Sequence, residues 1–158
     1  MKEFETLLDD MNAELSELQK KNQEKSQKIF QEMFKTFFDS NPEIKAIGWR
    51  QYTPYFNDGD ECVFRCNVDY AWATNTENAS NISYGEYDGD DGDSVWIYDP
   101  DYGDFNDEII PKSVRTNMTS FRKILAKISD DTYKAMFGDH VTVIATRDGF
   151  ETEYYEHD

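Results

Sequence analysis

Apolar residues recur at helical spacing from Phe4 onward, and as far as Leu18 they alternate at intervals of four and three residues. This alternation is the spacing of a coiled-coil seam. Continuing the register places Asn22 at an a position, Lys25 at a d position and Ile29 at the next a position. A polar Asn at one a position can fix register and strand number at some cost in stability. The pattern predicts a homo-oligomer that assembles through Leu8, Met11, Leu15, Leu18, Asn22 and Ile29; the alternative is an amphipathic helix packed on its own domain.

After Ile29 the apolar face widens, because Phe30, Met33, Phe34 and Phe37 follow the i, i+3, i+4 and i+7 positions of a helix that packs on a sheet. The sequence Asp39-Ser40-Asn41-Pro42 predicts the end of this helix, since a residue before proline avoids the α region. We therefore expect two parts: an N-terminal helical arm over residues 1–40 that serves oligomerisation, and one domain over residues 41–158.

The second part alternates strand and helix patterns. Residues 44–52 and 61–73 predict two strands, the latter half-buried and antiparallel because every second residue is apolar. Residues 82–87 and 94–98 are shorter strand candidates, and residues 114–128 carry a helical apolar face. Ser129 is expected to cap a short helix that ends at Gly138, and an Asp148-Gly149 turn to close a C-terminal hairpin. The order predicts an α+β fold: a long N-terminal, partly coiled-coil helix, an antiparallel sheet of four to six strands, C-terminal helices and a closing hairpin.

The charge of the chain narrows the classes of partner. The 158 residues carry a formal net charge of −17, but they also include 11 Phe, 10 Tyr and 3 Trp, whereas disordered chains are poor in aromatic residues. A surface this acidic repels phosphate backbones and anionic lipids, so we expect neither direct nucleic-acid binding nor membrane binding. The acidic, amphipathic N-terminus is unlike a signal peptide, and no apolar run is long enough to span a bilayer. A cytoplasmic location is expected.

The cysteines and histidines are too few, and too far apart in the sequence, to form a disulfide or a zinc site. Cys62 and Cys66 lie four residues apart on a predicted strand, about 13 Å at strand rise, which is too far for a disulfide. The chain has two histidines, His140 and His157, and they complete no Cys/His zinc set. We expect no cofactor.

Residues 49–60 hold the densest set of groups that could bind a ligand. Aromatic faces stack planar molecules, while Arg, Gln, Asn and Asp read their edges. The alternative is structural, because aromatic residues pack well in strands and Asn-Asp-Gly-Asp forms a turn. The ligand-binding hypothesis uses Trp49, Arg50, Gln51, Tyr52, Tyr55, Asn57 and Asp58.

Charges are unevenly distributed along the rest of the chain. The loop over residues 86–108 is acidic, and its carboxylates could be solvated, could bind calcium irregularly, or could mimic a phosphate backbone through Asp88, Asp90, Asp91 and Asp93. A basic stretch, residues 112–127, follows it. Its cations could pair with the acidic loop; alternatively Arg115 and Arg122, with Arg65, could hold the phosphates of a nucleotide-like ligand.

The run WRQYTPYFNDGDECVF, residues 49–64, resembles a WxQYTPYFNDGDxCxF signature of small bacterial and bacteriophage proteins. Arg50 and Glu61 depart from the more neutral residues expected at those positions. The resemblance extends to a helical N-terminal arm and an acidic, Tyr- and His-containing tail such as EYYEHD. The family has no established chemistry, so the resemblance implies only an intracellular, phage-linked setting.

Motifs for phosphate loops, dinucleotide sites, nucleophile elbows and zinc proteases are missing from the sequence, so we do not expect an enzyme. We expect instead a non-enzymatic binding protein, of a phage counter-defence type, that sequesters a nucleotide-like small ligand in an aromatic and arginine site. One alternative is an acidic interaction protein of the DNA-mimic type that blocks a basic host protein surface. Another is an oligomeric structural or assembly protein.

Overall fold

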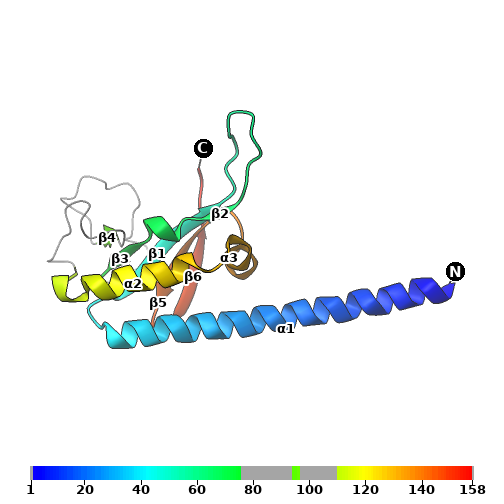
Figure 1. Ribbon diagram of the computed structural model, residues 1–158, viewed down its shortest axis with the longest axis horizontal. Helices are drawn as coiled ribbons and strands as arrows, with labels where there is room; N and C mark the ends of the chain where they lie inside the picture. The colour runs from blue at the N-terminus through cyan, green and yellow to red at the C-terminus, as the bar shows by residue number, and fades with distance from the viewer. Residues whose placement is uncertain (1, 76–93, 97–109, 158) are drawn as a thin grey trace.

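The N-terminal part of the chain is a single helix, α1 (Lys2–Ser40), in this computed structural model, which describes residues 2–75, 94–96 and 110–157 (Figure 1). The predicted helix end is confirmed, since α1 stops directly before Asn41-Pro42. Asn41 closes the last turn, because its backbone N–H and its Nδ2 both donate to the carbonyl oxygen of Phe37, at 3.0 and 2.9 Å. Its Oδ1 accepts from Asn117 Nδ2 at 2.8 Å, which ties the end of α1 to helix α2 (Arg115–Ala126).

The other elements form an antiparallel sheet with the helices on one face, so the predicted α+β class is confirmed (Figure 1). The strands lie in the order β4-β3-β1-β5-β6, and β2 pairs with the end of β1. Two 3₁₀ helices, η1 and η3, precede β3 and α2, and α3 precedes β5. The bounds are β1 (Ala46–Tyr52), β2 (Arg65–Cys66), η1 (Val68–Tyr70), β3 (Trp72–Thr74), β4 (Ser94–Trp96), η3 (Lys112–Val114), α3 (Asp130–Phe137), β5 (Val141–Thr146) and β6 (Gly149–Tyr154).

The prediction of one continuous strand over residues 61–73 is wrong. Only β2 and β3 are strands in this part of the chain, and η1 turns the chain between them. Asn67 begins this turn, because its N–H donates to the Arg50 carbonyl at 2.8 Å and its own carbonyl accepts from Tyr70 N at 3.0 Å. Cys62 and Cys66 form no disulfide, as expected. Of the shorter candidates, residues 82–87 lie outside the described residues and residues 94–96 form β4.

The C-terminal predictions hold with one shift. Ser129 caps α3, its side chain accepting from Thr132 N at 3.2 Å, and Gly138 follows the helix with a φ of +90° that few other residues adopt. The closing hairpin is confirmed, but its two-residue turn is Arg147-Asp148 rather than Asp148-Gly149, because Gly149 already pairs with Thr146.

The sheet separates two kinds of surface. Alternate residues of β1, including Ile47, Trp49 and Gln51, point toward the helices and are fully buried. This core is rich in rings: Phe34 of α1 stacks on Trp49 with ring centres 5.8 Å apart, and Phe37 stacks on Phe121 of α2 at 4.1 Å. The other face, which we call the outer face, carries Gly48, Arg50 and Tyr52 of β1.

Gly48 makes room on this outer face. A Cβ at this position would lie 2.5 Å from Cε2 of the Trp72 indole, so only glycine lets the ring lie across β1. Trp72 in turn packs with Ala46 and Ile144 in a second, smaller buried cluster.

Most of α1 projects away from the domain (Figure 1). Every residue from 2 to 25, which we call the projecting segment, is exposed, while Phe30, Phe34, Phe37 and Phe38 are buried in the core. Gln23 Nε2 donates to the Ala135 carbonyl of α3 at 2.6 Å, near the point where α1 reaches the domain. The helical arm predicted over residues 1–40 thus contributes its last part to the core of the domain.

Candidate functional site

A small pocket opens on the outer face of the sheet, where β1, η1, β3 and the C-terminal tail meet. Its volume is about 170 Å³, and it is lined by Arg50, Tyr52, Asn67, Tyr70, Trp72 and Tyr155. The strand alternation that buries Trp49 and Gln51 turns Arg50 and Tyr52 outward, and Gly48 leaves space for the Trp72 indole beside them. Four of the six side chains are aromatic, so the pocket offers mainly ring faces and edges to a ligand. We call it the Arg50 pocket.

An arginine stacked on a tyrosine is the central feature of the Arg50 pocket. The guanidinium carbon of Arg50 lies 4.1 Å from the centre of the Tyr155 ring, and the Tyr52 ring meets that ring edge-on at 5.3 Å. Tyr155 is held there by its backbone N–H, which donates to the His140 carbonyl at 2.7 Å. A guanidinium fixed over a ring can bind an anion or a carbonyl while neighbouring rings stack on a planar molecule.

Beside the pocket, the two histidines and Tyr55 form a stacked cluster. His157 stacks on Tyr55 with ring centres 4.4 Å apart, and its Nε2 shares a 2.8 Å hydrogen bond with His140 Nδ1. The Tyr55 hydroxyl lies 3.2 Å from that of Tyr154, and this hydrogen bond, with burial and nearby negative charges, raises the pKa of Tyr55. The cluster anchors the tail that carries Tyr155.

Asp139 fixes the loop before β5. Its carboxylate accepts from Thr53 N at 2.7 Å, from the Thr53 hydroxyl at 2.6 Å and from His140 N at 2.8 Å. Burial acts to raise the pKa of Asp139, but these three hydrogen bonds and the neighbouring imidazole outweigh it and lower the pKa.

The assignment of Trp49 and Gln51 to a ligand site is wrong. Both side chains are fully buried on the helix face of β1 and bond to each other, Trp49 Nε1 donating to Gln51 Oε1 at 3.1 Å. Gln51 Nε2 donates to the carbonyls of Tyr133 and Gly138, at 2.9 and 2.8 Å, and so joins α3 to the sheet. Their role is structural.

The structure brings together only some of the other predicted ligand residues. Arg50 and Tyr52 line the pocket, and Arg65 pairs directly opposite Tyr52, so its side chain lies on the same sheet face. Asn57 and Asp58 form the exposed turn that the alternative interpretation expected, with Asn57 Nδ2 donating to the Glu61 carbonyl at 3.2 Å.

The two arginines of α2 lie with the helices and do not line the pocket. Arg122 pairs with Asp69 of η1 at 3.5 Å, and Arg115 begins α2. Neither Arg115 nor Arg122 is among the described residues that line the pocket, so the structure does not bring them together with Arg50 there. The acidic residues Asp88, Asp90, Asp91 and Asp93 lie outside the described residues.

Sequence reasoning missed Asn67, Tyr70, Trp72 and Tyr155 as pocket residues. The first three belong to a segment that was expected to be a regular strand, and Tyr155 reaches Arg50 from the far end of the chain. The tail sequence EYYEHD was noted within the resemblance, but no local pattern says which surface such a tail contacts.

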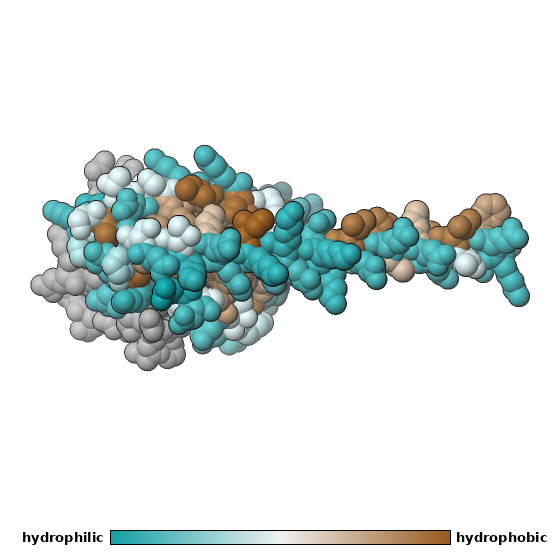
Figure 2. Space-filling model, turned by 90° about the horizontal axis from the view of Figure 1, so that it is seen from below, coloured by the Kyte–Doolittle hydropathy of each residue, from teal (hydrophilic) through white to brown (hydrophobic). Residues whose placement is uncertain are grey.

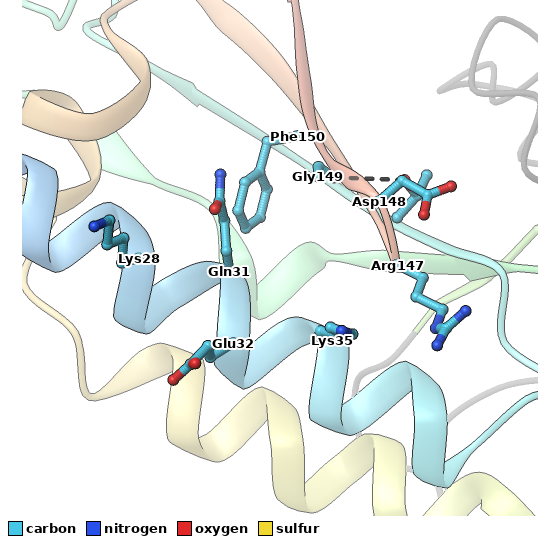
Figure 3. A pocket seen from close by; sticks show the side chains of 9 residues that line it. Lys28, Gln31, Glu32, Lys35, Arg147, Asp148, Gly149 and Phe150 are labelled. Atoms are coloured by element: carbon cyan, nitrogen blue, oxygen red, sulfur yellow. Dashed lines mark hydrogen bonds between the residues drawn. The ribbon is translucent and has the colours of Figure 1, made fainter.

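A larger and more open cavity, of about 510 Å³, lies between α1 and the β5–β6 hairpin (Figure 3). Figure 3 shows Gln31 of α1 beside the Phe150 ring. Its lining mixes both signs of charge, and the Arg147 Nε donates to Asp39, so that cation is already engaged. Compared with the Arg50 pocket, this cavity offers less ring surface and no defined preference for one charge. Its charged lining residues are Lys28, Glu32, Lys35, Arg147 and Asp148.

Residues 2–75, 94–96 and 110–157 contain no group of three His, Cys, Asp or Glu side chains placed to hold a metal ion. Within the same ranges, no helix combines the length and apolar character needed to cross a membrane. The chain matches no model of a known protein family, no curated protein and no solved structure.

Proposed function

We propose that this protein binds a small planar ligand in the Arg50 pocket. The observation that carries the proposal is the Arg50 guanidinium stacked at 4.1 Å on Tyr155 inside a wall of four aromatic side chains. Aromatic side chains suit a planar guest, and the arginine adds a donor for a carbonyl or an anion.

The size of the pocket limits the part of the ligand that can enter. Drug-sized molecules occupy cavities of roughly 300–1,000 Å³. A volume of about 170 Å³ instead suits one ring system. A nucleotide-like ligand would place its base against the rings and leave its phosphate at the rim. Arg65 lies opposite Tyr52 on the same face, which supports it as the residue that would bind that phosphate.

The lining of the pocket favours capture rather than catalysis. Arginine, tyrosine, tryptophan and asparagine supply stacking and hydrogen bonds. Among the described residues, the lining includes no carboxylate, histidine or cysteine to act as an acid, base or nucleophile. A non-enzymatic binding protein is therefore the proposed class. The resemblance of residues 49–64 to a phage-linked signature adds the setting to the proposal, namely counter-defence by sequestration.

Native mass spectrometry of freshly purified protein, followed by thermal-shift and calorimetric titration with nucleobases, nucleosides, nucleotides and cyclic nucleotides, tests this function. Loss of one base–ring stack costs about 1–3 kcal/mol. We therefore expect Arg50→Met and Tyr155→Leu to weaken binding about tenfold or more. The matched control Arg147→Met, which makes the same change as Arg50→Met outside the pocket, should bind as the wild type does.

Two results would refute the proposal. A protein that retains no small molecule and is stabilised by no member of the panel does not bind nucleotide-like ligands. A ligand that binds the Arg50→Met and Tyr155→Leu variants as tightly as the wild type occupies another site. Circular dichroism of each variant separates loss of binding from loss of fold.

A further inference from the structure

The projecting segment exposes a row of large apolar side chains. Figure 2 shows brown side chains along one edge of the projecting helix, between hydrophilic ones. Their exposed fractions are 72% for Phe4, 52% for Leu8, 51% for Met11, 49% for Leu15 and 56% for Leu18, and Ile29 further along α1 is 58% exposed. These are the a and d positions of the heptad pattern, so the seam is open to solvent. A stripe of this length on a helix outside the core is typical of a helix–helix interface.

The charge along α1 changes sign between Gln19 and Lys20. Residues 2–19 carry six carboxylates and one lysine, whereas residues 20–28 carry four lysines and one glutamate. A parallel pair of α1 helices would set the acidic halves side by side and would place Lys25 against itself at a d position. An antiparallel pair would set each acidic half against the basic half of the other helix.

We infer that α1 pairs antiparallel with α1 of a second copy of this chain, with Phe4 of each copy against Ile29 of the other. The partner is thus a second copy, and the two-fold axis of the dimer passes through the middle of the seam. In this register Leu15 meets Leu18 at the centre, Met11 meets Asn22, and Leu8 covers the aliphatic stem of Lys25. The overlap from residue 4 to residue 29 extends over about 37 Å of helix.

This register covers every exposed seam residue and creates matched charges beside it. In an antiparallel coiled coil the g positions of the two helices face each other, and residue numbers that add to 35 meet in this register. Glu14 therefore faces Lys21 of the second copy, and the two-fold axis creates this contact twice. An antiparallel pair shifted by one heptad in one direction would put Glu14 against Glu14 and leave Ile29 uncovered. A shift in the other direction would put Lys21 against Lys21. In a parallel pair, Glu14 and Lys21 do not meet.

Charge reversal distinguishes these arrangements. A Glu14→Lys homodimer has lysine against lysine at both contacts, and a Lys21→Glu homodimer has glutamate against glutamate. Mixing the two variants restores opposite charges at both contacts. We expect each variant alone to dimerise more weakly than the wild type. In an equimolar mixture at low salt, the ratio of heterodimer to the two homodimers together should exceed its statistical value of one about fivefold or more.

The matched control reverses the same charges on the same helix outside the seam. Glu17→Lys and Lys20→Glu lie at c and f positions, which face solvent in every paired arrangement. We expect a near-statistical mixture from this pair. Native mass spectrometry of differently mass-labelled chains reads the heterodimer fraction, sedimentation equilibrium gives the dissociation constants, and circular dichroism checks that α1 stays helical.

Three results would overturn the inference. A wild-type chain that is monomeric in sedimentation at high micromolar concentration would remove the interface. A mixture of Glu14→Lys and Lys21→Glu with no excess heterodimer would exclude this register. An equal excess from the control pair would assign the preference to general charge attraction rather than to the contact between Glu14 and Lys21.

Discussion

Gln51 is the best position at which to test the account of the core, because its buried amide makes three hydrogen bonds, two of which link β1 to α3 and the glycine that follows it. It accepts from Trp49 Nε1 at 3.1 Å and donates to the carbonyls of Tyr133 and Gly138 at 2.9 and 2.8 Å. The substitution Gln51→Met keeps nearly the same volume and removes every one of these bonds. It therefore isolates the hydrogen bonding from the packing.

The expected cost follows from the groups left behind. A buried polar group that loses its partner costs about 1–3 kcal/mol, and the indole N–H of Trp49 is such a group. The carbonyl oxygens of Tyr133 and Gly138 each have a second lone pair, so the loss of one hydrogen bond at either carbonyl should cost less than the loss at the indole N–H. We expect Gln51→Met to lower the free energy of unfolding by about 3 kcal/mol, equivalent to roughly 6–12 °C in melting temperature for a chain of this size.

A double-mutant cycle with Trp49→Phe makes the reasoning specific. The phenylalanine variant removes the indole donor, so in the combined variant no N–H is orphaned. The double variant should then lose about 1 kcal/mol less than the sum of the two single losses. The exposed Gln31→Met on α1 serves as the control and should stay within about 0.5 kcal/mol of the wild type.

Urea unfolding followed by far-ultraviolet circular dichroism gives the required free energies, at one fixed protein concentration so that any self-association contributes equally. A loss below about 1 kcal/mol for Gln51→Met, or strictly additive single losses, would refute the hydrogen-bonding account of this residue. Unchanged ligand affinity of the variant under native conditions would agree with its place on the helix side of the sheet.

Three further predictions concern separate parts of the domain. Gly48→Ala places a Cβ 2.5 Å from the Trp72 ring, so it should cost about 1–3 kcal/mol in urea unfolding and weaken ligand binding by displacing the indole. Burial raises the pKa of the Cys66 thiol, so titration with a thiol reagent under native conditions should show Cys62 reacting much faster than Cys66. The pKa of Asp139 is lowered, so its carboxylate stabilises the fold at a pH above the pKa of the same group in the unfolded chain, and this stabilisation is lost as the pH falls. The difference in unfolding free energy between the wild type and Asp139→Asn should therefore be constant near neutral pH and shrink below about pH 4.

Periodicity and caps predicted the elements whose structure is decided locally. The change of apolar spacing after Ile29 marks the place where α1 begins to pack on the domain, and Asn41-Pro42 ends that helix. Ser129 and Gly138 delimit α3 because capping depends on one or two residues.

Sequence did not predict which face of β1 is buried. Aromatic and polar residues occur at both the odd- and the even-numbered positions of this strand, so neither Trp49 nor Arg50 by itself shows which face is buried. A shift of the strand register by one residue would move every side chain of the strand to the opposite face of the sheet. Only the partner strands decide the matter: Ile47 and Trp49 lie opposite Ala145 and Val143 of β5, whose side chains are buried.

The broken strand had a different cause. Apolar residues alternate through residues 61–73 as they would in an extended strand, but the carbonyl of Asn67 accepts from Tyr70 and its N–H reaches Arg50. The resulting turn redirects Tyr70 and Trp72 toward the outer face, where they line the Arg50 pocket. The residue pattern predicted a strand, while tertiary pairing with β1 selected a turn, and the candidate site depends on that turn.

The proposed pocket and the proposed dimer use opposite sides of the molecule. Arg50 and Tyr155 lie on the outer face of the sheet, while the last part of α1 packs on the other face and leaves Leu15 and Ile29 exposed. An antiparallel α1 pair therefore leaves both pockets open, at the two ends of the paired helices. Ligand affinity per chain should then be the same in the wild type and in a Glu14→Lys variant that dimerises weakly, with two independent sites in each dimer. If ligand affinity instead changed with the fraction of dimer, then pairing of α1 would affect the pocket at Tyr155. That result would contradict the argument that the core around Trp49 and Gln51 keeps the two sites independent.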